Sequence, residues 1–320
     1  MSLYANSVGA LQTLVFEWAV QPALFALGAM DLAEKMFDAT EWLILGAIEI
    51  LILMAILRPL EAWRPVEIWK DRDGVGTDVI YTLLGRLGVL PLATFLLLSP
   101  GFDWIEGELR LAGFSPFHLE DLAPAIAASP ALSFALYFFV LDLAEYWRHR
   151  LQHRFDWWWA LHALHHSQRK MSFWADSRNH LLDDVLAGVW MATIALVIGI
   201  PPGQFFLIVI ASRMIESLSH ANLRMTFGTI GERLVVSPRF HRLHHAIGIG
   251  HEGVHQGCNF AVLLPLWDMV FRTASFAGKV EPTGVRDQLA GRDYGRGFWA
   301  QQNLGLIRMG KAIIRTSPNR

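Results

Sequence analysis

The chain has 320 residues, of which 53% are hydrophobic and only 18% are charged. This share of apolar residues exceeds that of a typical soluble domain, so a membrane protein is expected. The formal net charge of −2 gives no broad electropositive surface, which argues against nucleic acid as a partner. The single cysteine, Cys258, excludes an intramolecular disulfide and a cysteine-rich zinc or iron–sulfur site.

Four apolar segments have lengths at or near the roughly 20 residues that a helix needs to cross a bilayer. These segments are 8–30, 42–57, 79–99 and 131–147. Glu17, Glu49 and Arg86 lie inside the apolar runs, where an unpaired charge is costly. We therefore expect these side chains to face other protein groups or to extend to the membrane interface.

A fifth apolar region, 185–212, is interrupted by Pro201, Pro202 and Gly203. Proline ends a helix and this sequence favours a turn, so the region is predicted to be a helical hairpin. Each arm would hold roughly 14 residues, or about 20 Å of helix, against a hydrocarbon core of about 30 Å. We expect the hairpin to enter the membrane without crossing it fully.

Lysine and arginine concentrate in two connecting segments, 58–77 and 148–184, whereas 31–41 and 100–122 are mainly acidic. Basic loops stay on the cytoplasmic side of a membrane. Four crossings and a returning hairpin then bring all histidine-rich segments to the cytoplasmic face. The sequence thus predicts an all-α integral membrane bundle of about four transmembrane helices, with a short apolar hairpin and a cytoplasmic, histidine-rich dimetal cap.

Eight of the thirteen histidines form three clusters with metal-ligand spacing. Side chains three or four residues apart share a helix face, and neutral imidazole suits iron, zinc, copper or nickel. Two HxxHH strings and one HxxxH string on one membrane face predict a site for two transition-metal ions. The clusters are His149 and His153; His162, His165 and His166; and His241, His244 and His245.

Two further histidines, His180 and His220, flank the apolar hairpin, which would return both to the same face. With them the chain offers ten candidate ligands, enough for two ions. A metal-bound histidine usually donates its other ring N–H to a carboxylate or a carbonyl. Acids near the histidines are therefore candidates for that supporting role: Asp142, Glu145, Asp183, Asp184 and Glu216.

Residues from about 134 to 273 resemble the fatty acid hydroxylase/sterol desaturase superfamily of integral-membrane, histidine-rich dimetal oxygenases. The resemblance rests on HRLQH at 149–153, HALHH at 162–166, the single His180 and His220, HRLHH at 241–245, Asn259-Phe260 and Trp267-Asp268. It implies that the ten histidines hold two iron ions and that Asn259 and Asp268 support them. Many members carry an acid where this chain has Gly257, so the surroundings of the site are expected to be rebuilt there.

The chain then reads as one structural domain with three regions. We predict N-terminal transmembrane helices in 1–130, a fatty acid hydroxylase-like catalytic region in 131–275 and a cytoplasmic tail in 276–320. Within the tail, the mixed apolar and basic segment 298–314 is typical of an interfacial helix.

Four more residues are candidates for a substrate or proton path. His251 and His255 fit the roles of ligand, proton carrier or exposed loop residue, and we favour the last. Trp158, in a run of three tryptophans, suits an aromatic belt at the headgroups or the wall of a substrate pocket. Asp176 suits a contact to a substrate headgroup or a surface ion pair.

Members of the superfamily typically use O2 and two irons to hydroxylate or desaturate lipid C–H bonds. The resemblance therefore implies an oxidoreductase that acts on a fatty acyl chain, a sterol-like lipid or an aminolipid, with zinc as a substitute for iron in purified protein. The chain shows no dinucleotide fingerprint and no cysteine cluster, so a separate electron donor is implied, such as a ferredoxin, a cytochrome b5-type protein or a reductase. We expect a multi-pass protein of a bacterial inner membrane.

Two other classes of function compete with this interpretation. A membrane zinc hydrolase would also use histidines, but it would usually carry a glutamate directly after a metal-binding histidine, and these clusters have none. A metal store or transporter needs polar residues along a transmembrane path, whereas these histidines lie outside the apolar runs. The oxygenase is the favoured prediction.

Overall fold

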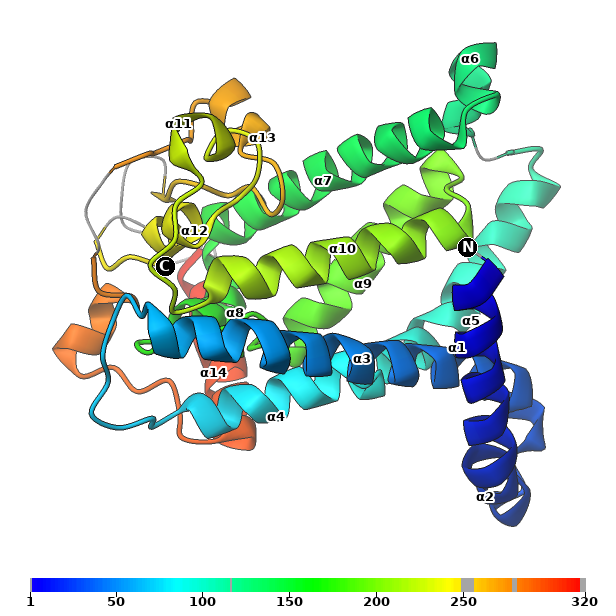
Figure 1. Cartoon of the computed structure of the whole chain (residues 1–320), viewed down its shortest axis with the longest axis horizontal. Helices are drawn as coiled ribbons and strands as arrows, with labels where there is room; N and C mark the ends of the chain where they lie inside the picture. The colour runs from blue at the N-terminus through cyan, green and yellow to red at the C-terminus, as the bar shows by residue number, and fades with distance from the viewer. Residues whose placement is uncertain (1, 116, 249–255, 278–280, 317–320) are drawn as a thin grey trace.

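The structure, a computed structural model, describes residues 2–115, 117–248, 256–277 and 281–316 (Figure 1). In these ranges the chain is helical, and an isolated antiparallel bridge between Ala246 and Thr283 is the single β-type pairing. The predicted all-α fold is confirmed. The longer helices are α1 (Ser2–Val15), α3 (Ala33–Trp63), α4 (Val75–Arg86), α5 (Val89–Leu111), α7 (Pro130–Arg154), α8 (Asp156–His166), α9 (Leu181–Ile198), α10 (Pro202–His220) and α14 (Phe298–Thr316). The short helices are η1 (Phe16–Val20), α2 (Gln21–Leu27), η2 (Met30–Leu32), η3 (Leu119–Leu122), α6 (Pro124–Ala127), α11 (Gly228–Gly231), α12 (Pro238–His244), α13 (Leu266–Val270) and η5 (Arg286–Ala290).

Five helices, α3, α4, α7, α9 and α10, run along the long axis of the molecule and pack against one another (Figure 1). Helices α8, α12 and α14, with the loops around them, gather at one end of this bundle, which we call the histidine end. At the other end, α1 and α2 lie at a steep angle to α3 rather than alongside it. The bundle therefore collects the three histidine clusters at a single end.

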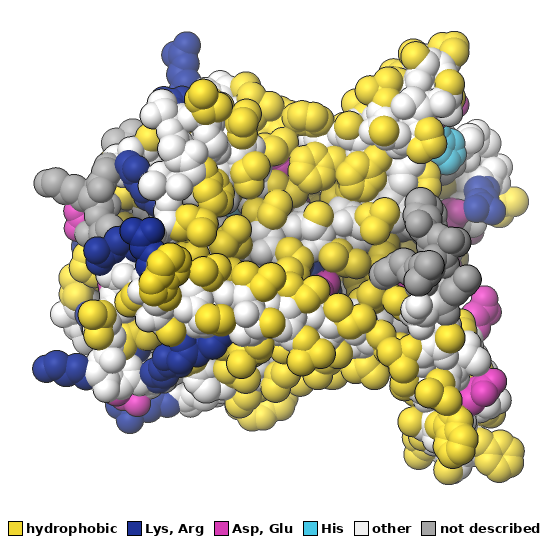
Figure 2. All heavy atoms as spheres, in the orientation of Figure 1, with side chains coloured by type: hydrophobic (Ala, Val, Ile, Leu, Met, Phe, Trp, Pro, Cys, Tyr) yellow, Lys and Arg dark blue, Asp and Glu magenta, His cyan; other side chains and the backbone are white. Residues whose placement is uncertain are grey.

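Within the described ranges, four helical stretches are long and apolar enough to cross a membrane: Ser7–Leu27, Met30–Trp63, Val89–Leu111 and Leu181–Ile198. Figure 2 shows hydrophobic side chains over the long sides of the bundle and Lys and Arg side chains concentrated at the histidine end. The predicted number of spans is confirmed, but their identity differs. The expected crossing 131–147 lies in α7, which is not among the four because acidic and other polar residues enter its C-terminal half, and α9 takes its place.

The prediction of one continuous apolar helix over 79–99 is wrong, because this range contains the end of α4 and the beginning of α5. Gly88 adopts a φ of 83° directly before α5 begins, and this left-handed conformation favours glycine. Helix α4 ends at Arg86 and Gly88 caps the start of α5, so the chain changes direction there.

The two buried charges of the apolar segments pair with each other, as predicted. Nη1 of Arg86, at the end of α4, lies 2.5 Å from Oε2 of Glu49 in α3. Gly46 permits the close crossing of these helices, because a side chain there would collide with the backbone carbonyl of Arg86. By contrast, Glu17 is exposed on the surface of η1.

The predicted hairpin forms, but its arms are longer than the expected 14 residues. Helix α9 has 18 residues and α10 has 19, which is about 27 Å of helix for each arm. The prediction was wrong because α9 begins directly after His180 and α10 extends to His220, so polar residues of both arms continue the helices beyond the apolar region. Both arms therefore reach the histidine end.

The C-terminal segment packs into the histidine end. Helix α14 lies against α8, where Nε of Arg308 donates to the carbonyl oxygen of Ala160 at 3.2 Å. Nε2 of Gln302 donates to the hydroxyl of Tyr81 in α4 at 2.8 Å. Helix α14 thus connects α8 to the bundle.

Candidate metal centre

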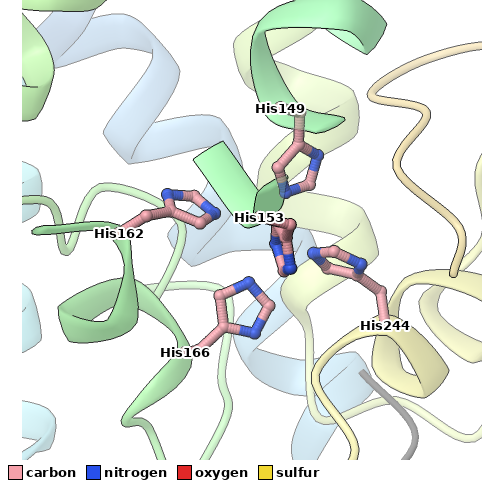
Figure 3. Close-up of side chains that lie close together, drawn as sticks. All are labelled: His149, His153, His162, His166 and His244. Atoms are coloured by element: carbon pink, nitrogen blue, oxygen red, sulfur yellow. The ribbon is translucent and has the colours of Figure 1, made fainter. Parts of the chain in front are cut away.

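Five histidines from three helices converge at the first of two sites. Each of them offers one ring nitrogen, and these nitrogens all lie within 4.8 Å of one another (Figure 3). We call these residues the first histidine group: His149 and His153 of α7, His162 and His166 of α8, and His244 of α12.

Four other histidines converge in the same way beside the first group. Nε2 of His220 lies 3.1 Å from Nε2 of His165 and 3.1 Å from Nε2 of His241. Nε2 of His245 lies 3.1 Å from Nε2 of His241. These four residues form the second histidine group, and all four are buried.

Adjacent histidines in the chain belong to different groups. His165 and His166 end α8, and His244 and His245 lie at the end of α12, and in each pair one histidine belongs to the first group and the other to the second. The rings of His166 and His245 stack with centroids 4.3 Å apart across the boundary. The two groups are therefore parts of one centre.

Local sequence explains how α12 presents its histidines. The helix starts at Ser237, whose side chain accepts a hydrogen bond from the amide of Phe240 at 3.1 Å. Pro238 follows at the first helical position, where proline is favoured. This start puts His241 and His244 in the last turn of the helix and His245 directly after it.

Backbone carbonyls orient two histidines of the first group. Nδ1 of His149 donates to the carbonyl of Phe260 at 2.8 Å, and Nδ1 of His244 donates to the carbonyl of Cys258 at 2.7 Å. Since a carbonyl only accepts, Nδ1 carries the proton in both rings, and Nε2 keeps a lone pair.

Asn259 and Asp268, predicted to support the site, fix the loop that carries these carbonyls. Asn259 has a φ of 59°, and its side-chain amide donates to the carbonyls of Phe240 and Ser275, both at 2.9 Å. The carboxylate of Asp268 accepts from the amide of Phe260 at 2.9 Å and from the hydroxyl of Thr273 at 2.6 Å. Both residues therefore act on the histidines through the backbone.

Asp183, another predicted supporting residue, reaches a histidine directly. Its carboxylate lies 3.3 Å from Nδ1 of His162 and accepts from Nε1 of Trp158 at 2.7 Å. It also accepts from Nε2 of Gln152 at 2.9 Å and 3.0 Å. Sequence reasoning missed Gln152, although its place inside the HRLQH string was a signal, and it placed Trp158 in a pocket wall or an aromatic belt rather than at this carboxylate.

The other predicted acids lie elsewhere. Asp142 accepts from the amides of Leu263 and Leu264 and from Trp267, and so it ties α7 to the segment before α13. Glu145 pairs with Arg148 at 2.5 Å. For Glu216 it is the backbone carbonyl, rather than the carboxylate, that accepts from Nδ1 of His220, at 2.8 Å.

His180 is not brought to either group. It stands at the N-terminus of α9, where Nδ1 accepts from the amide of Leu182 at 3.1 Å. Its Nε2 donates to the carbonyl of Gln302 in α14 at 2.8 Å. Nine of the ten predicted ligands thus converge, and the tenth connects two helices. His251 and His255 lie outside the described residues.

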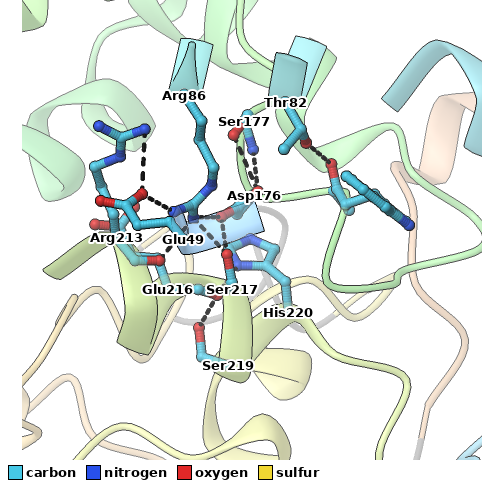
Figure 4. A network of polar contacts seen from close by, with 12 residues as sticks. Glu49, Thr82, Arg86, Asp176, Ser177, Arg213, Glu216, Ser217, Ser219 and His220 are labelled. Carbon is cyan, nitrogen blue, oxygen red and sulfur yellow. Dashed lines mark hydrogen bonds and ion pairs between the residues drawn. The ribbon is translucent and has the colours of Figure 1, made fainter. Parts of the chain in front are cut away.

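Asp176 lies in a buried network rather than in a surface ion pair (Figure 4). Nη2 of Arg86 lies 2.7 Å from Oδ2 of Asp176, while Nη1 of the same guanidinium meets Glu49. The hydroxyl of Ser217 in α10 donates to the same carboxylate. The network therefore joins α3, α4 and α10 three residues before His220.

Burial keeps the histidines in the protonation state that binds metals. It lowers the pKa of His162 and holds the pKa values of His165, His166, His241 and His245 well below the usual value of an imidazole. A neutral imidazole has a free lone pair for coordination.

The donor atoms of the first group fit a metal ion. Nε2 of His149, His162 and His166 is buried without a hydrogen-bond partner among the residues described in the structure. A buried polar atom left in that state is costly, and coordination removes the cost. The neutral nitrogen donors suit a transition metal rather than magnesium or calcium.

The spacing of the second group fits a metal ion as well. Two nitrogens that each lie about 2.1 Å from one ion are roughly 3.0–3.4 Å apart. The three separations of 3.1 Å between the Nε2 atoms fall in that range. Both groups thus offer a preformed set of nitrogens.

A cavity of about 100 Å³ lies beside both groups, and His149, His162, His165, His220 and His241 form part of its wall. Most of its remaining wall is polar or charged. The polar lining consists of Arg148, Gln152, Asp176, Asn179, Asp183, Asp184, Glu216 and Ser219, with Ala187 and Val262 as the apolar members. We call this space the reaction cavity.

Comparison with known proteins places this centre in a family. Residues 134–273 match the family model Fatty acid hydroxylase. The chain is 28% identical over 284 residues to the ornithine lipid hydroxylase OlsE of Rhizobium tropici, an alignment that covers 83% of this chain and 77% of that protein. No solved structure matches the chain.

A second kind of relative matches a shorter part of the chain. Alkylglycerol monooxygenase of Danio rerio is 28% identical over 138 residues, and that of Homo sapiens is 27% identical over 139 residues. These alignments cover 43% and 42% of this chain and 29% of each relative, so the chain spans less than a third of the length of those proteins.

These relatives are lipid hydroxylases and monooxygenases, which supports an O2-dependent oxidoreductase and gives no support to the zinc hydrolase. All the histidine strings and the Asn259-Phe260 and Trp267-Asp268 pairs fall inside the matched range. Residues 134–273 therefore match the fatty acid hydroxylase family, and the chain is similar over most of its length to a lipid hydroxylase, in agreement with the predicted resemblance.

Proposed function

We propose that the chain is a membrane-bound, non-haem di-iron oxygenase that hydroxylates a C–H bond in the amine-bearing headgroup of a lipid. In the overall reaction one atom of O2 enters the C–H bond as a hydroxyl group, and the other leaves as water. Two electrons and two protons from an external donor complete the balance.

The two histidine groups would hold one iron each. Bound iron supplies the activation of O2 that an inert C–H bond requires. The chain's own residues hold the nitrogens in place: the Phe260 and Cys258 carbonyls set the rings of His149 and His244, and Asp183 sets His162. Such partners raise the basicity of a ligand and fix its orientation.

The charged residues that line the reaction cavity favour one class of substrate. Four carboxylates face it, and Arg148, its single guanidinium, is already paired with Glu145. Two of the carboxylates are engaged, Asp176 by Arg86 and Asp183 by its three donors.

The other two carboxylates, those of Asp184 and Glu216, have no ion-pair partner among the residues that the structure describes. Burial raises the pKa of Glu216 to about 8, and an ammonium group in the cavity would stabilise the charged form of both carboxylates. An acyl chain or a sterol-like ring would instead leave them facing hydrocarbon, which is costly. This difference favours an aminolipid headgroup over the other two lipid classes.

The similarity to an ornithine lipid hydroxylase supports the same substrate class, because ornithine carries an amino group and the alignment covers most of this chain. Hydroxylation is proposed rather than desaturation, since both kinds of relative are named for the insertion of oxygen.

The orientation and the electron donor belong to the same proposal. Basic segments of the chain lie at the histidine end (Figure 2), and basic loops stay cytoplasmic. We infer that this end faces the cytoplasm of a bacterial inner membrane, where a ferredoxin, a cytochrome b5-type protein or a reductase can deliver electrons.

Lipid analysis with labelled oxygen tests the function. Membranes of a host that expresses the full chain are compared with those of a host that expresses His149→Ala, both grown under ¹⁸O-labelled O2. We expect an amine-bearing lipid to gain a single labelled oxygen in the wild-type sample alone, and tandem mass spectrometry to find that oxygen in the headgroup fragment.

Other outcomes would contradict the proposal in distinguishable ways. A labelled oxygen in the acyl fragment would refute the headgroup assignment. A loss of two hydrogens without label would indicate a desaturase, and a cleaved lipid formed without O2 would indicate a hydrolase.

A further inference from the structure

A larger cavity lies away from the reaction cavity, where α3 ends and the segment between α10 and α12 passes. Its volume is about 360 Å³, and it shares no lining residue with the reaction cavity. We call it the arginine pocket, because Arg64, Arg224, Arg239 and Arg242 line it.

The charge of the arginine pocket is strongly one-sided. Among the residues that the structure describes, its four guanidinium groups face one lining carboxylate, that of Glu281. Guanidinium groups bind phosphate in a bidentate manner, and several in one pocket select an anion.

Arg242 forms the buried part of this charge. The residue is 5% exposed, and its Nη2 lies 2.7 Å from Oε1 of Glu67. Its Nε and Nη1 are buried without a hydrogen-bond partner among the described residues. A guanidinium in this state has donors left for a ligand, and leaving them unsatisfied is costly.

The other three arginines are exposed at the rim of the pocket. Arg239 has contacts of its own, since its Nη2 donates to the carbonyls of Phe276 and Ala277 at 3.1 Å and 3.4 Å. Arg64 lies over the ring of Trp63, 5.7 Å from its centroid. Arg224 leaves its side chain at the surface.

Most of the rest of the wall is apolar, with Leu60, Leu223, Met225 and Leu243 among its members. The pocket begins at the last turn of the candidate span Met30–Trp63, and Trp63 itself is 75% exposed. Tryptophan followed by arginine at the end of a span is typical of the headgroup layer. The pocket therefore combines an anion site with an apolar wall at the depth of lipid headgroups.

We propose that the arginine pocket binds the phosphate of an anionic glycerophospholipid, with the glycerol and the upper acyl chain against its apolar wall. Basic pockets at the cytoplasmic ends of transmembrane helices are suited to such headgroups. The proposal rests on Arg242 and its neighbours and does not depend on the chemistry of the histidine groups.

Lipid binding to the purified full chain in a mild detergent tests this site. Native mass spectrometry measures the dissociation constant of phosphatidylglycerol, with phosphatidylcholine and inorganic phosphate as separate probes. The variant Arg224→Gln/Arg239→Gln removes two exposed guanidiniums of the pocket. The matched control, Arg292→Gln/Arg296→Gln, removes two exposed guanidiniums outside it.

We expect phosphatidylglycerol to bind the wild type and the control equally and to bind the pocket variant about tenfold or more weakly. Phosphatidylcholine should bind weakly to all three. Equal weakening in the control would show a diffuse charge effect and overturn the proposal, as would unchanged binding in the pocket variant. Displacement of the lipid is expected only at high inorganic phosphate, and tighter binding of inorganic phosphate than of the lipid would overturn the lipid as the ligand.

The thermal midpoint of each variant without lipid serves as a folding control. Because Arg224 and Arg239 are exposed, we expect both double variants to unfold within a few degrees of the wild type. Arg242→Gln is measured as a third variant, and its lipid affinity should fall at least as far as that of the exposed pair. An Arg242→Gln protein that folds and binds phosphatidylglycerol like the wild type would overturn the role of the buried guanidinium.

Discussion

The carbonyl oxygen of Phe260 accepts a hydrogen bond of 2.8 Å from Nδ1 of His149, which lies 111 residues earlier in the chain. Asp268 holds the amide of the same Phe260 at 2.9 Å. A carboxylate that does not contact a histidine thus controls the direction in which a histidine nitrogen points.

Asp268→Asn tests this indirect control. The amide side chain keeps one acceptor oxygen but cannot accept from Phe260, Ala261 and Thr273 together, so the Phe260 carbonyl should shift. We expect the metal affinity of the first group to fall about 10- to 100-fold. Chelator competition measures it, with the exposed Asp156→Asn as the control. An unchanged affinity in a folded Asp268→Asn protein would remove the residue from the support of the site.

Metal content distinguishes His220 from His180. The purified wild type should bind about two transition-metal ions, and zinc in place of iron would occupy the same nitrogens. His220→Asn removes a nitrogen of the second group and should lose about one ion. His180→Asn keeps a capping side chain at α9 and should retain both. Elemental analysis measures the number of metal ions per protein in each variant. A loss of metal in His180→Asn would show that the residue coordinates an ion.

Substrate recognition is expected to depend on Asp184 and Glu216. Asp184→Asn and Glu216→Gln remove carboxyl groups that a bound ammonium would keep charged, and they leave the nitrogens of both histidine groups in place. We expect KM for an aminolipid to rise about 10-fold for each, from the loss of one charge-assisted contact, while the metal content is unchanged. Asp156→Asn, which changes an exposed acid that does not line the cavity, is the control. Equal KM values in all proteins would contradict an ammonium group in the cavity.

We expect the buried ion pairs of Arg86 to contribute strongly to the free energy of unfolding. Arg86→Leu leaves Asp176 buried without its paired cation and leaves Glu49 with the longer, 3.4 Å contact to Nη2 of Arg213, which should cost about 3–5 kcal/mol of the free energy of unfolding. Arg110→Leu removes an exposed partner of Glu106 and should cost at most about 1 kcal/mol. Denaturant unfolding in detergent compares the two. Similar losses in both variants would mean that the buried network contributes little.

Cysteine labelling tests the orientation. In a Cys258→Ser background, a cysteine in place of Lys70 lies in the basic loop after α3, and one in place of Arg110 lies near the end of α5. An impermeant reagent applied to the periplasmic side should label Arg110→Cys but not Lys70→Cys. The opposite pattern would contradict the cytoplasmic placement of the histidine end.

The sequence predicted most of the histidine centre because helical spacing dictates which side chains share a face. His149 and His153, or His162 and His166, are four residues apart, so any regular helix points them together. His180 is the last residue of the loop 167–180. The position of a loop residue does not follow from helical spacing, and the ring of His180 contacts α14 instead of the two histidine groups.

The residues that orient the histidines were also harder to predict than the histidines themselves. Asp142 lies seven residues before His149, about 10 Å along the helix, which is too far for a hydrogen bond. The backbone carbonyls of Phe260 and Cys258 orient His149 and His244 instead. Every residue has such a carbonyl, so the amino-acid type does not reveal which carbonyl accepts a hydrogen bond. The break at Gly88 had a sequence signal, the glycine itself, but the apolar run around it concealed the turn.

The alternation of neighbouring histidines between the two groups has a consequence for assembly. An ion held by His166 and His244 fixes the ends of α8 and α12, and the same backbone then fixes His165 and His245. The entropy lost on binding the first ion therefore need not be lost again on binding the second, and occupancy should be cooperative. In a cell short of iron, the protein is expected to divide into fully loaded and empty molecules, with few half-loaded ones.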